Sequence, residues 1–158
     1  MFVCTLLILC FQGAQSNHNI TIDDYFSLSY VSSCAVSPNG VYTAWTEGRW
    51  DETLDKRNTD IWIIETNDSN AIPLRLTFDE SYDGSLQWGT DESWLYFSSR
   101  RGSTGDDLPR NGKNQVWRIK PDGTQLMAVT RLAQSVEDWM VSDNGKLMYY
   151  ITSDASQV

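Results

Sequence analysis

Residues 36–46 read Val36-Ser37-Pro38-Asn39-Gly40-Val41-Tyr42-Thr43-Ala44-Trp45-Thr46, a turn followed by a strand in which side chains alternate. Two blurred copies of this segment follow, and the positions equivalent to Ser37 are Gly89 and Ser142. These positions lie 52 and 53 residues apart, so the period is regular. A fixed period of this size indicates an array of small β units that bury their faces against one another.

The remainder of each period recurs as well. Asp60-Ile61-Trp62-Ile63-Ile64 is echoed by Gln115-Val116-Trp117-Arg118-Ile119, and Thr77 is echoed by Thr130. Four antiparallel strands per unit, with aromatic residues inside, favour a propeller blade over a sandwich because neighbouring blades cover both faces. We therefore predict an all-β fold, a partial β-propeller of four-stranded antiparallel blades, with two complete blades and the start of a third.

The propeller portion is expected to span residues 34–158, with blades at about 34–78, 85–131 and 138–158. No helix is predicted, because the apolar residues alternate with a period of two. Residues 47–59 and 100–114 are polar and are expected to form long loops. The turns depend on glycines such as Gly40, placed where a positive φ is needed. The third unit ends at Val158, so we expect the chain to be shorter than the architecture it encodes.

The first residues form an uncharged apolar run followed by small and polar residues. Its length and the small residues Ala14 and Ser16 predict a signal peptide over residues 1–16, with a buried first strand as the alternative. The run is too short to span a membrane, so we predict a secreted or periplasmic protein that is not an integral membrane protein. Residues 17–33 are interpreted as a polar leading segment in which Ile20 and Ile22 form a short edge strand.

Composition excludes one class of partner. The formal net charge is −9, and Arg100-Arg101 and the other short basic runs are interleaved with acidic residues. Nucleic-acid binding needs clustered Lys and Arg, so no nucleic-acid partner is expected. We interpret these arginines as solvated loop residues. Cys34 is expected to be a buried, unreactive thiol.

At this level of detail the sequence resembles a known family. It is similar to the N-terminal propeller of prolyl-oligopeptidase-family serine peptidases, in the branch of secreted dipeptidyl aminopeptidases and acylaminoacyl-peptidase-like enzymes. The segments that carry the resemblance are Tyr25-Phe26, Ala35–Gly40, Arg49–Trp62, Leu76-Thr77-Phe78, Gln87-Trp88, Tyr96–Arg100 and Gln115-Val116-Trp117. The repeated turn alone is shared with exported propellers of the TolB type.

The resemblance implies a role for this chain and a partner that it lacks. In that family an α/β-hydrolase domain follows the propeller and holds the catalytic Ser, Asp and His. This sequence contains no Gly-x-Ser-x-Gly nucleophile motif, and its single histidine is His18. We therefore assign no catalytic, cofactor-binding or metal-ligating residue and expect this chain alone to be inactive. The leading hypothesis is the propeller of an exported peptidase that gates and positions peptide substrate; the alternative is a non-enzymatic TolB-like propeller that binds a protein partner.

Two sets of residues, acidic groups and tryptophans, could suggest a binding site, but we assign neither a binding role. Two acidic groups occur in expected loops, and neither follows a calcium-binding loop pattern in full, so we interpret both as solvated. They are Asp51-Glu52 with Asp55, and Asp79-Glu80 with Asp83. Six tryptophans recur at equivalent blade positions and are expected to be core residues. They are Trp45, Trp62, Trp88, Trp94, Trp117 and Trp139. Trp50 is the exception: we expect it to lie in a loop and to contact substrate or the hydrolase domain.

Overall fold

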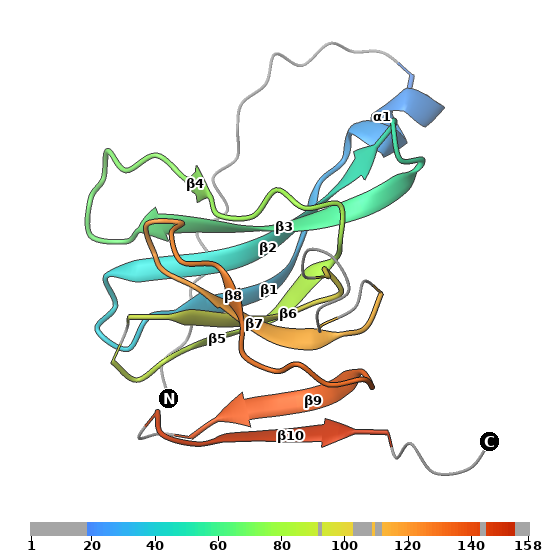
Figure 1. Ribbon diagram of the computed structural model, residues 1–158. Coiled ribbons are helices and arrows are strands. Elements are labelled where there is room, and N and C mark those ends of the chain that lie inside the picture. The colour runs from blue at the N-terminus through green and yellow to red at the C-terminus, as the bar shows by residue number, and fades with distance from the viewer. Residues whose placement is uncertain (1–18, 92, 103–108, 110–111, 143–144, 154–158) are drawn as a thin grey trace, which may run out of the picture.

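A computed structural model describes residues 19–91, 93–102, 109, 112–142 and 145–153. Three antiparallel sheets are stacked in chain order, and we call them blades 1 to 3 (Figure 1). Blades 1 and 2 have four strands each, in the orders β1-β2-β3-β4 and β5-β6-β7-β8, and blade 3 has the pair β9-β10. This arrangement confirms the predicted all-β fold. The expected signal peptide and His18 lie outside the described residues.

Blade 1 begins earlier than the sequence predicts. Its strands are β1 (Tyr30–Val36), β2 (Tyr42–Asp51), β3 (Lys56–Glu65) and β4 (Leu74–Arg75). The turn between β1 and β2 closes as predicted, because the Gly40 amide donates to the Ser37 carbonyl at 2.8 Å. Gly40 has a φ of 74°, a backbone conformation that residues with a Cβ rarely adopt.

The expected loop over residues 47–59 is wrong. Strands β2 and β3 stay paired through Gly48 opposite Thr59 and on to Asp51 opposite Lys56, so the segment is a hairpin arm. The main-chain ladder explains the difference, because backbone hydrogen bonds extend a hairpin without any apolar pattern in its side chains. Only residues 52–55 remain as the turn, and Asp55 has a φ of 49°.

The expected absence of a helix and the edge strand at Ile20 and Ile22 are also wrong. A short helix, α1 (Ile22–Ser27), precedes β1. Its start is fixed by Thr21, whose backbone amide donates to Asp24 Oδ2 at 2.7 Å. This is the Thr-x-x-acid pattern of a capping box, in which the third helical residue returns to the cap. Among the described residues no helix is long and apolar enough to cross a membrane.

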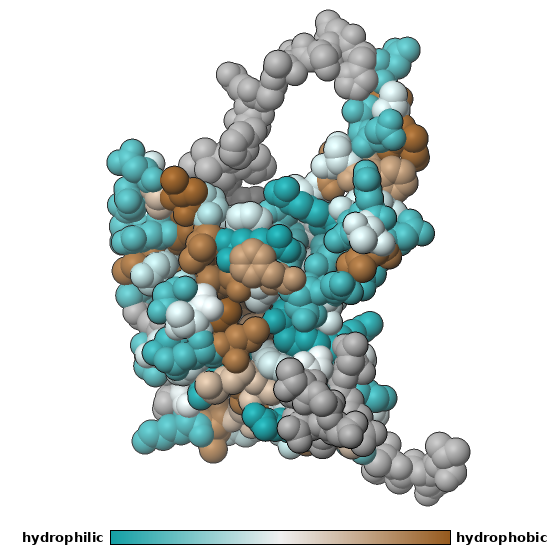
Figure 2. Space-filling view, turned by 45° about the horizontal axis from the view of Figure 1, so that its top comes forward, coloured by the Kyte–Doolittle hydropathy of each residue, from teal (hydrophilic) through white to brown (hydrophobic). Residues whose placement is uncertain are grey.

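Helix α1 lies against the hairpin arm. The ring of Phe26 sits 4.8 Å from that of Trp50 in β2, measured between centroids, and the Arg57 guanidinium lies 5.3 Å from the Tyr25 ring centre. Figure 2 shows apolar residues exposed at its upper right, where α1 and the segment leading into β1 lie; Ile22 and Leu28 are among the exposed residues. The helix therefore attaches to the arm through one aromatic contact and one cationic contact.

Blades 2 and 3 repeat the pattern. Blade 2 contains β5 (Asp83–Trp88), β6 (Leu95–Ser99), β7 (Gln115–Ile119) and β8 (Met127–Ala128). Blade 3 contains β9 (Val136–Val141) and β10 (Met148–Thr152). Each fourth strand is only two residues long, but the residue after it still donates to the third strand: Leu76 to the Ile61 carbonyl and Val129 to the Val116 carbonyl.

The main core lies between blades 1 and 2. From blade 1 it receives Ala44, Ile61 and Ile63, and from blade 2 it receives Phe97 and Trp117, all of them buried. A second cluster between blades 2 and 3 includes Tyr96, Val116, Val136 and Val141. Successive strand residues point to opposite faces, so β6 contributes Phe97 to one cluster and Tyr96 to the other.

The tryptophans divide according to the face on which they lie. Trp88 and Trp117 are buried, as predicted for core residues. Trp45 and Trp62 pair across β2 and β3 but are only half-buried, because they alternate with the residues that face blade 2. The prediction of core packing was therefore too broad, since it holds only for faces that another blade covers.

Candidate functional site

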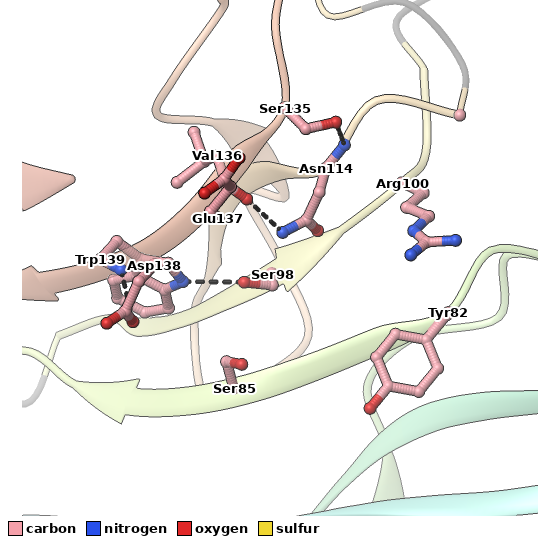
Figure 3. A pocket seen from close by; sticks show the side chains of 11 residues that line it. Tyr82, Ser85, Ser98, Arg100, Asn114, Ser135, Val136, Glu137, Asp138 and Trp139 are labelled. Atoms are coloured by element: carbon pink, nitrogen blue, oxygen red, sulfur yellow. Dashed lines mark hydrogen bonds between the residues drawn. The ribbon is translucent and has the colours of Figure 1, made fainter. Parts of the chain in front are cut away.

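A cavity of about 600 Å³ lies where blades 2 and 3 meet. Blade 2 and its flanking segments supply Tyr82, Ser85, Ser98 and Arg100, and blade 3 supplies residues 136–139 (Figure 3). Most of these residues stand at the ends of strands along one edge of the stack. The site is thus built by the sheet ends and their connections, where binding residues commonly lie.

Strand alternation decides which side chains of β6 reach the cavity. Phe97 and Ser99 face blade 1, whereas Tyr96 and Ser98 face blade 3. The Trp139 indole N–H donates to Ser98 Oγ at 2.8 Å, and the Trp139 ring lies 6.4 Å from that of Tyr96. Trp139 therefore forms a fixed wall of the cavity.

Polar side chains tie blade 3 to blade 2 beside the cavity. Asn114 Nδ2 donates to the Val136 carbonyl at 2.7 Å, and the Asn114 amide donates to Ser135 Oγ at 3.1 Å. At the other end of β9, Gln87 donates to the Val141 carbonyl and accepts from its amide, both at 3.0 Å. These hydrogen bonds hold β9 in a defined position, so the lining residues it carries are fixed relative to blade 2.

Opposite charges stand on two sides of the cavity. The guanidinium of Arg100 lies on one side, and the carboxylates of Glu137 and Asp138 lie on the other (Figure 3). Within the described residues, the side chains of Arg100 and Glu137 make no hydrogen bond or ion pair with other side chains. Asp138 Oδ1 accepts from the Trp139 amide at 2.8 Å, which leaves its second oxygen for another donor. The arrangement can bind a ligand that carries both an amine and an acid.

A buried ion pair stands directly behind the cavity. Arg101 Nη2 lies 2.5 Å from Asp83 Oδ2, and Arg101 Nε donates to Ser99 Oγ at 2.9 Å. The side chains of Asp83 and Arg101 are 0% and 6% exposed. Both were interpreted from the sequence as solvated loop residues, and that interpretation is wrong, because both are buried and Arg101 lies over the rings of Phe97 and Trp117. Burial raises the pKa of Asp83 above its usual value, although Arg101 opposes this shift.

A second ion pair lies in blade 1. Arg75 Nη2 is 2.6 Å from Asp60 Oδ2, while Asp60 Oδ1 is buried without a hydrogen-bond partner. Burial raises the pKa of Asp60 to about 6, against the opposing effect of Arg75 and with a further increase from the charge of Asp83. The unpartnered oxygen explains why desolvation prevails, since one lone-pair site lost water and gained no donor.

The structure separates the acidic groups that the sequence singled out. Asp51 stands at the tip of the hairpin arm, where its Oδ1 accepts from the amides of Thr53 and Leu54 and so stabilises the turn. Asp79 and Glu80 are exposed, whereas Asp83 is buried in the ion pair described above. No group of three or more metal-ligating residues forms among the described residues.

Two further expectations need correction. Trp50 belongs to β2 and packs on Phe26, so it is not a loop residue. Cys34 is exposed, because its place in β1 directs it away from blade 2, opposite Trp45. The prediction of a buried Cys34 assumed that other blades cover both faces of every strand. The outer face of blade 1, however, is covered by neither blade 2 nor blade 3.

The cavity residues were missed by the sequence analysis. Glu137 and Asp138 come from β9, Arg100 follows β6, and Tyr82 precedes β5, so no local motif joins them. Their common signal is positional: each stands where a strand begins or ends on the same edge of the stack. Aligning the repeats by strand ends would have placed them together, but their charges would still have resembled ordinary loop residues.

Comparisons with known proteins give two kinds of similarity. The chain is 24% identical over 137 residues to the uncharacterized peptidase YuxL of Bacillus subtilis, an alignment covering 75% of this chain and 20% of that protein. It is 26% identical over 98 residues to an uncharacterized protein of Agrobacterium fabrum, covering 61% of this chain and 29% of that protein. The chain thus spans less than a third of the length of either relative. No protein-family model matches it.

A solved structure shares the fold. The structure described as TolB from Agrobacterium tumefaciens matches with a TM-score of 0.56 and 23% identity, covering 83% of this chain and 41% of that chain. At this identity the match shows that the two chains share an arrangement of strands, and it shows nothing about activity. The chain therefore has the fold of a TolB-like β-propeller, and its sequence is similar to that of an uncharacterized peptidase.

Proposed function

We propose that this chain is the N-terminal propeller portion of an exported serine peptidase of the prolyl-oligopeptidase type, in which it admits and positions peptide substrate. The observation that carries the proposal is the cavity between blades 2 and 3, with a cation on one side and two carboxylates on the other. The similarity to an uncharacterized peptidase over most of the chain supports it.

The chemistry of the cavity suits a short peptide. Glu137 and Asp138 offer acceptors for an ammonium group, and Arg100 offers a planar set of donors for a carboxylate. Tyr82 and Ser85 add hydroxyl groups between these poles. The volume lies within the range of about 300–1,000 Å³ that is usual for small-molecule sites. The net charge of −9 favours the approach of ligands with a free amine.

Catalysis belongs, in this proposal, to a hydrolase domain carried by polypeptide outside these 158 residues. The propeller would then select peptides by their ends and hold them before they reach the nucleophile. Export through the N-terminal apolar run is part of the same proposal, because such a peptidase would meet peptides outside the cytoplasm.

Peptide titration tests this function. We expect trialanine with free ends to bind the purified chain, measured by isothermal titration calorimetry, and N-acetyl-trialanine amide to bind more weakly. Glu137→Gln and Arg100→Gln should each weaken trialanine binding about tenfold, because each removes a charge-assisted hydrogen bond. Lys56→Gln, an exposed cation on the hairpin arm with no sequence neighbour in the cavity lining, is the matched control and should leave trialanine binding unchanged. Equal binding by all variants, or no binding of trialanine, would contradict the proposal.

A second candidate is a non-enzymatic TolB-like propeller that binds a protein partner. The exposed apolar side chains of blade 3 favour it, since Met140, Tyr149 and Ile151 share the face that blade 2 leaves open. Under this alternative trialanine should not bind, whereas replacing Tyr149 by Ser should abolish partner binding.

A further inference from the structure

We propose that the buried pair Asp83–Arg101 is a brace that positions Tyr82 and Arg100 for the ligand of the cavity. This inference rests on the proposed function, because it concerns the same peptide site. Asp83 and Arg101 do not touch the ligand; they act through the residues beside them in the chain.

The order of residues along the chain connects the brace to the cavity. Asp83 directly follows Tyr82, and Arg101 directly follows Arg100. In extended backbone, adjacent side chains point to opposite faces. Tyr82 and Arg100 line the cavity between blades 2 and 3, while Arg101 lies by Phe97 and Trp117 in the core between blades 1 and 2, so fixing one side restrains the other. Asp83 and Ser99 are also cross-strand partners, so the brace closes the end of the β5–β6 ladder.

The brace has little freedom to move. Arg101 donates through Nη2 to Asp83 and through Nε to Ser99, so the Nε–Nη2 edge of its guanidinium is held. Its guanidinium carbon lies 5.5 Å from the Phe97 ring centre and 5.8 Å from that of Trp117. Because these rings belong to the core between blades 1 and 2, the end of β6 is anchored to the best-packed part of the molecule.

Tyr82 is positioned by a second contact. Its ring lies over Gly84, where an added Cβ would stand 2.7 Å from the nearest ring carbon. Only a residue without a side chain leaves this space, and Gly84 itself is buried. The Tyr82 ring thus rests on bare backbone one residue beyond the brace, on the edge that opens into the cavity.

The ion pair Asp60–Arg75 provides an internal control. It has the same composition and lies in blade 1, but neither residue is adjacent in sequence to a residue that lines the cavity. The charges of Asp83 and Arg101 act on Asp60, so both residues of the control pair are replaced together to keep the net charge unchanged. This replacement should alter stability without altering the cavity. A purely stabilising role for Asp83–Arg101 predicts that both pairs behave alike, whereas the brace predicts that they differ.

The experiment measures trialanine binding by isothermal titration calorimetry in the full chain. Ser99→Ala removes the two hydrogen bonds that Ser99 Oγ accepts from Arg101, and Arg101→Lys removes the one from Nε. Both keep the charge pairing, so both are expected to fold. We expect a loss of affinity of about threefold to tenfold in each, the range for one to two lost hydrogen bonds that act indirectly. Gly84→Ala should give a similar loss by displacing the Tyr82 ring. Asp60→Asn with Arg75→Gln should bind within about twofold of the wild type, the range expected when no ligand contact changes.

A second readout separates positioning from stability. Arg100 distinguishes a free carboxylate from an amide, so the wild type should bind trialanine more tightly than trialanine amide. In Ser99→Ala this preference should shrink, because Arg100 is no longer held in place, and a change in stability alone would not move the ratio. Unchanged affinity and preference in Ser99→Ala, Arg101→Lys and Gly84→Ala would overturn the brace, as would equal losses in the Asp60 and Arg75 control. Failure of the wild type to bind trialanine would instead remove the proposed function, and the brace with it.

Discussion

Two equivalent arginines show that environment, and not residue type, decides what a side chain does. Arg49 and Arg101 are 52 residues apart, one repeat, and each lies within 6 Å of the tryptophan of its own third strand. Arg101 is covered by blade 1 and pairs with buried Asp83. Arg49 lies on the uncovered face, 65% exposed, and pairs with Glu47 in the same strand. The buried pair is costly to break, whereas the exposed one contributes little.

Asp60 should make stability depend on pH in an unusual direction. Its folded pKa of about 6 lies above the ordinary 3.8, so the folded state binds the proton more tightly than the unfolded state. The resulting stability is fully present below pH 3.8 and is lost as the pH rises through 6. Asp60→Asn should therefore flatten the unfolding free energy between pH 4 and 6 by about 1 to 3 kcal/mol relative to the wild type, measured by urea denaturation.

The control for this prediction is Asp122→Asn. Hydrogen bonds from Thr124 lower the pKa of Asp122 below the ordinary 3.8. The stability that its carboxylate contributes is therefore lost only as the pH falls below that value. The slope between pH 4 and 6 should stay as in the wild type. If the unfolding free energies of the wild type and Asp60→Asn changed in parallel between pH 4 and 6, the Asp60 carboxyl would not hold its proton in that range.

At the scale of elements, the hairpin arm and α1 form a unit outside the stacked sheets. Arm strands β2 and β3 extend beyond the blade core and carry Trp50 out to meet Phe26 (Figure 1). The helix has no buried residue, so it depends on this contact and on the capping of Thr21. A six-residue helix is unstable in water without such support.

Removing the Trp50 ring should release α1. Trp50→Ala is expected to speed amide hydrogen exchange in residues 22–28 by about threefold to tenfold, because an aromatic pair contributes about 0.5–1.5 kcal/mol. Exchange in β6 and β7 should not change, since the core lies elsewhere. Leu54→Ala at the arm turn is the matched control and should leave α1 protected. Uniform acceleration over the whole chain would mean that the arm and the blades unfold together.

At the scale of the molecule, equivalent positions in successive blades contribute different amounts to the free energy of unfolding. Phe97 occupies the position of Trp45 one repeat later, but blade 1 covers it completely. Trp45 faces outward and is half-buried. The interface between blades 1 and 2 therefore supplies most of the buried apolar area, while the outer face of blade 1 supplies little.

This difference should appear in denaturation experiments. Phe97→Ala should lower the unfolding free energy by about 3–5 kcal/mol, the usual cost of truncating a buried phenylalanine. Trp45→Ala should cost about 1–2 kcal/mol, because less of its surface leaves water on folding. Urea denaturation of both variants, followed by circular dichroism, measures the two costs. Equal costs would mean that another surface covers the outer face of blade 1 in solution.

The sequence by itself determined the repeat, the four-stranded antiparallel unit and the turns. These follow from local rules: a regular period, alternating side chains, and glycine at positions such as Gly40 where φ is positive. The capping signal of Thr21 and Asp24 is also local, although a helix of six residues is too short to show a helical period in its apolar residues.

Only the tertiary structure decided which faces are covered and which side chains meet. Which blade lies against each face decides the exposure and ion pairing of Arg49 and Arg101. It also decides the exposure of Cys34 and the burial of Asp83. The cavity depends on it as well, because Arg100 and Glu137 come from separate strands that meet only after the blades stack. The physical reason is that a strand carries the same alternation on both faces, and burial, desolvation and charge pairing are set by what packs against each face.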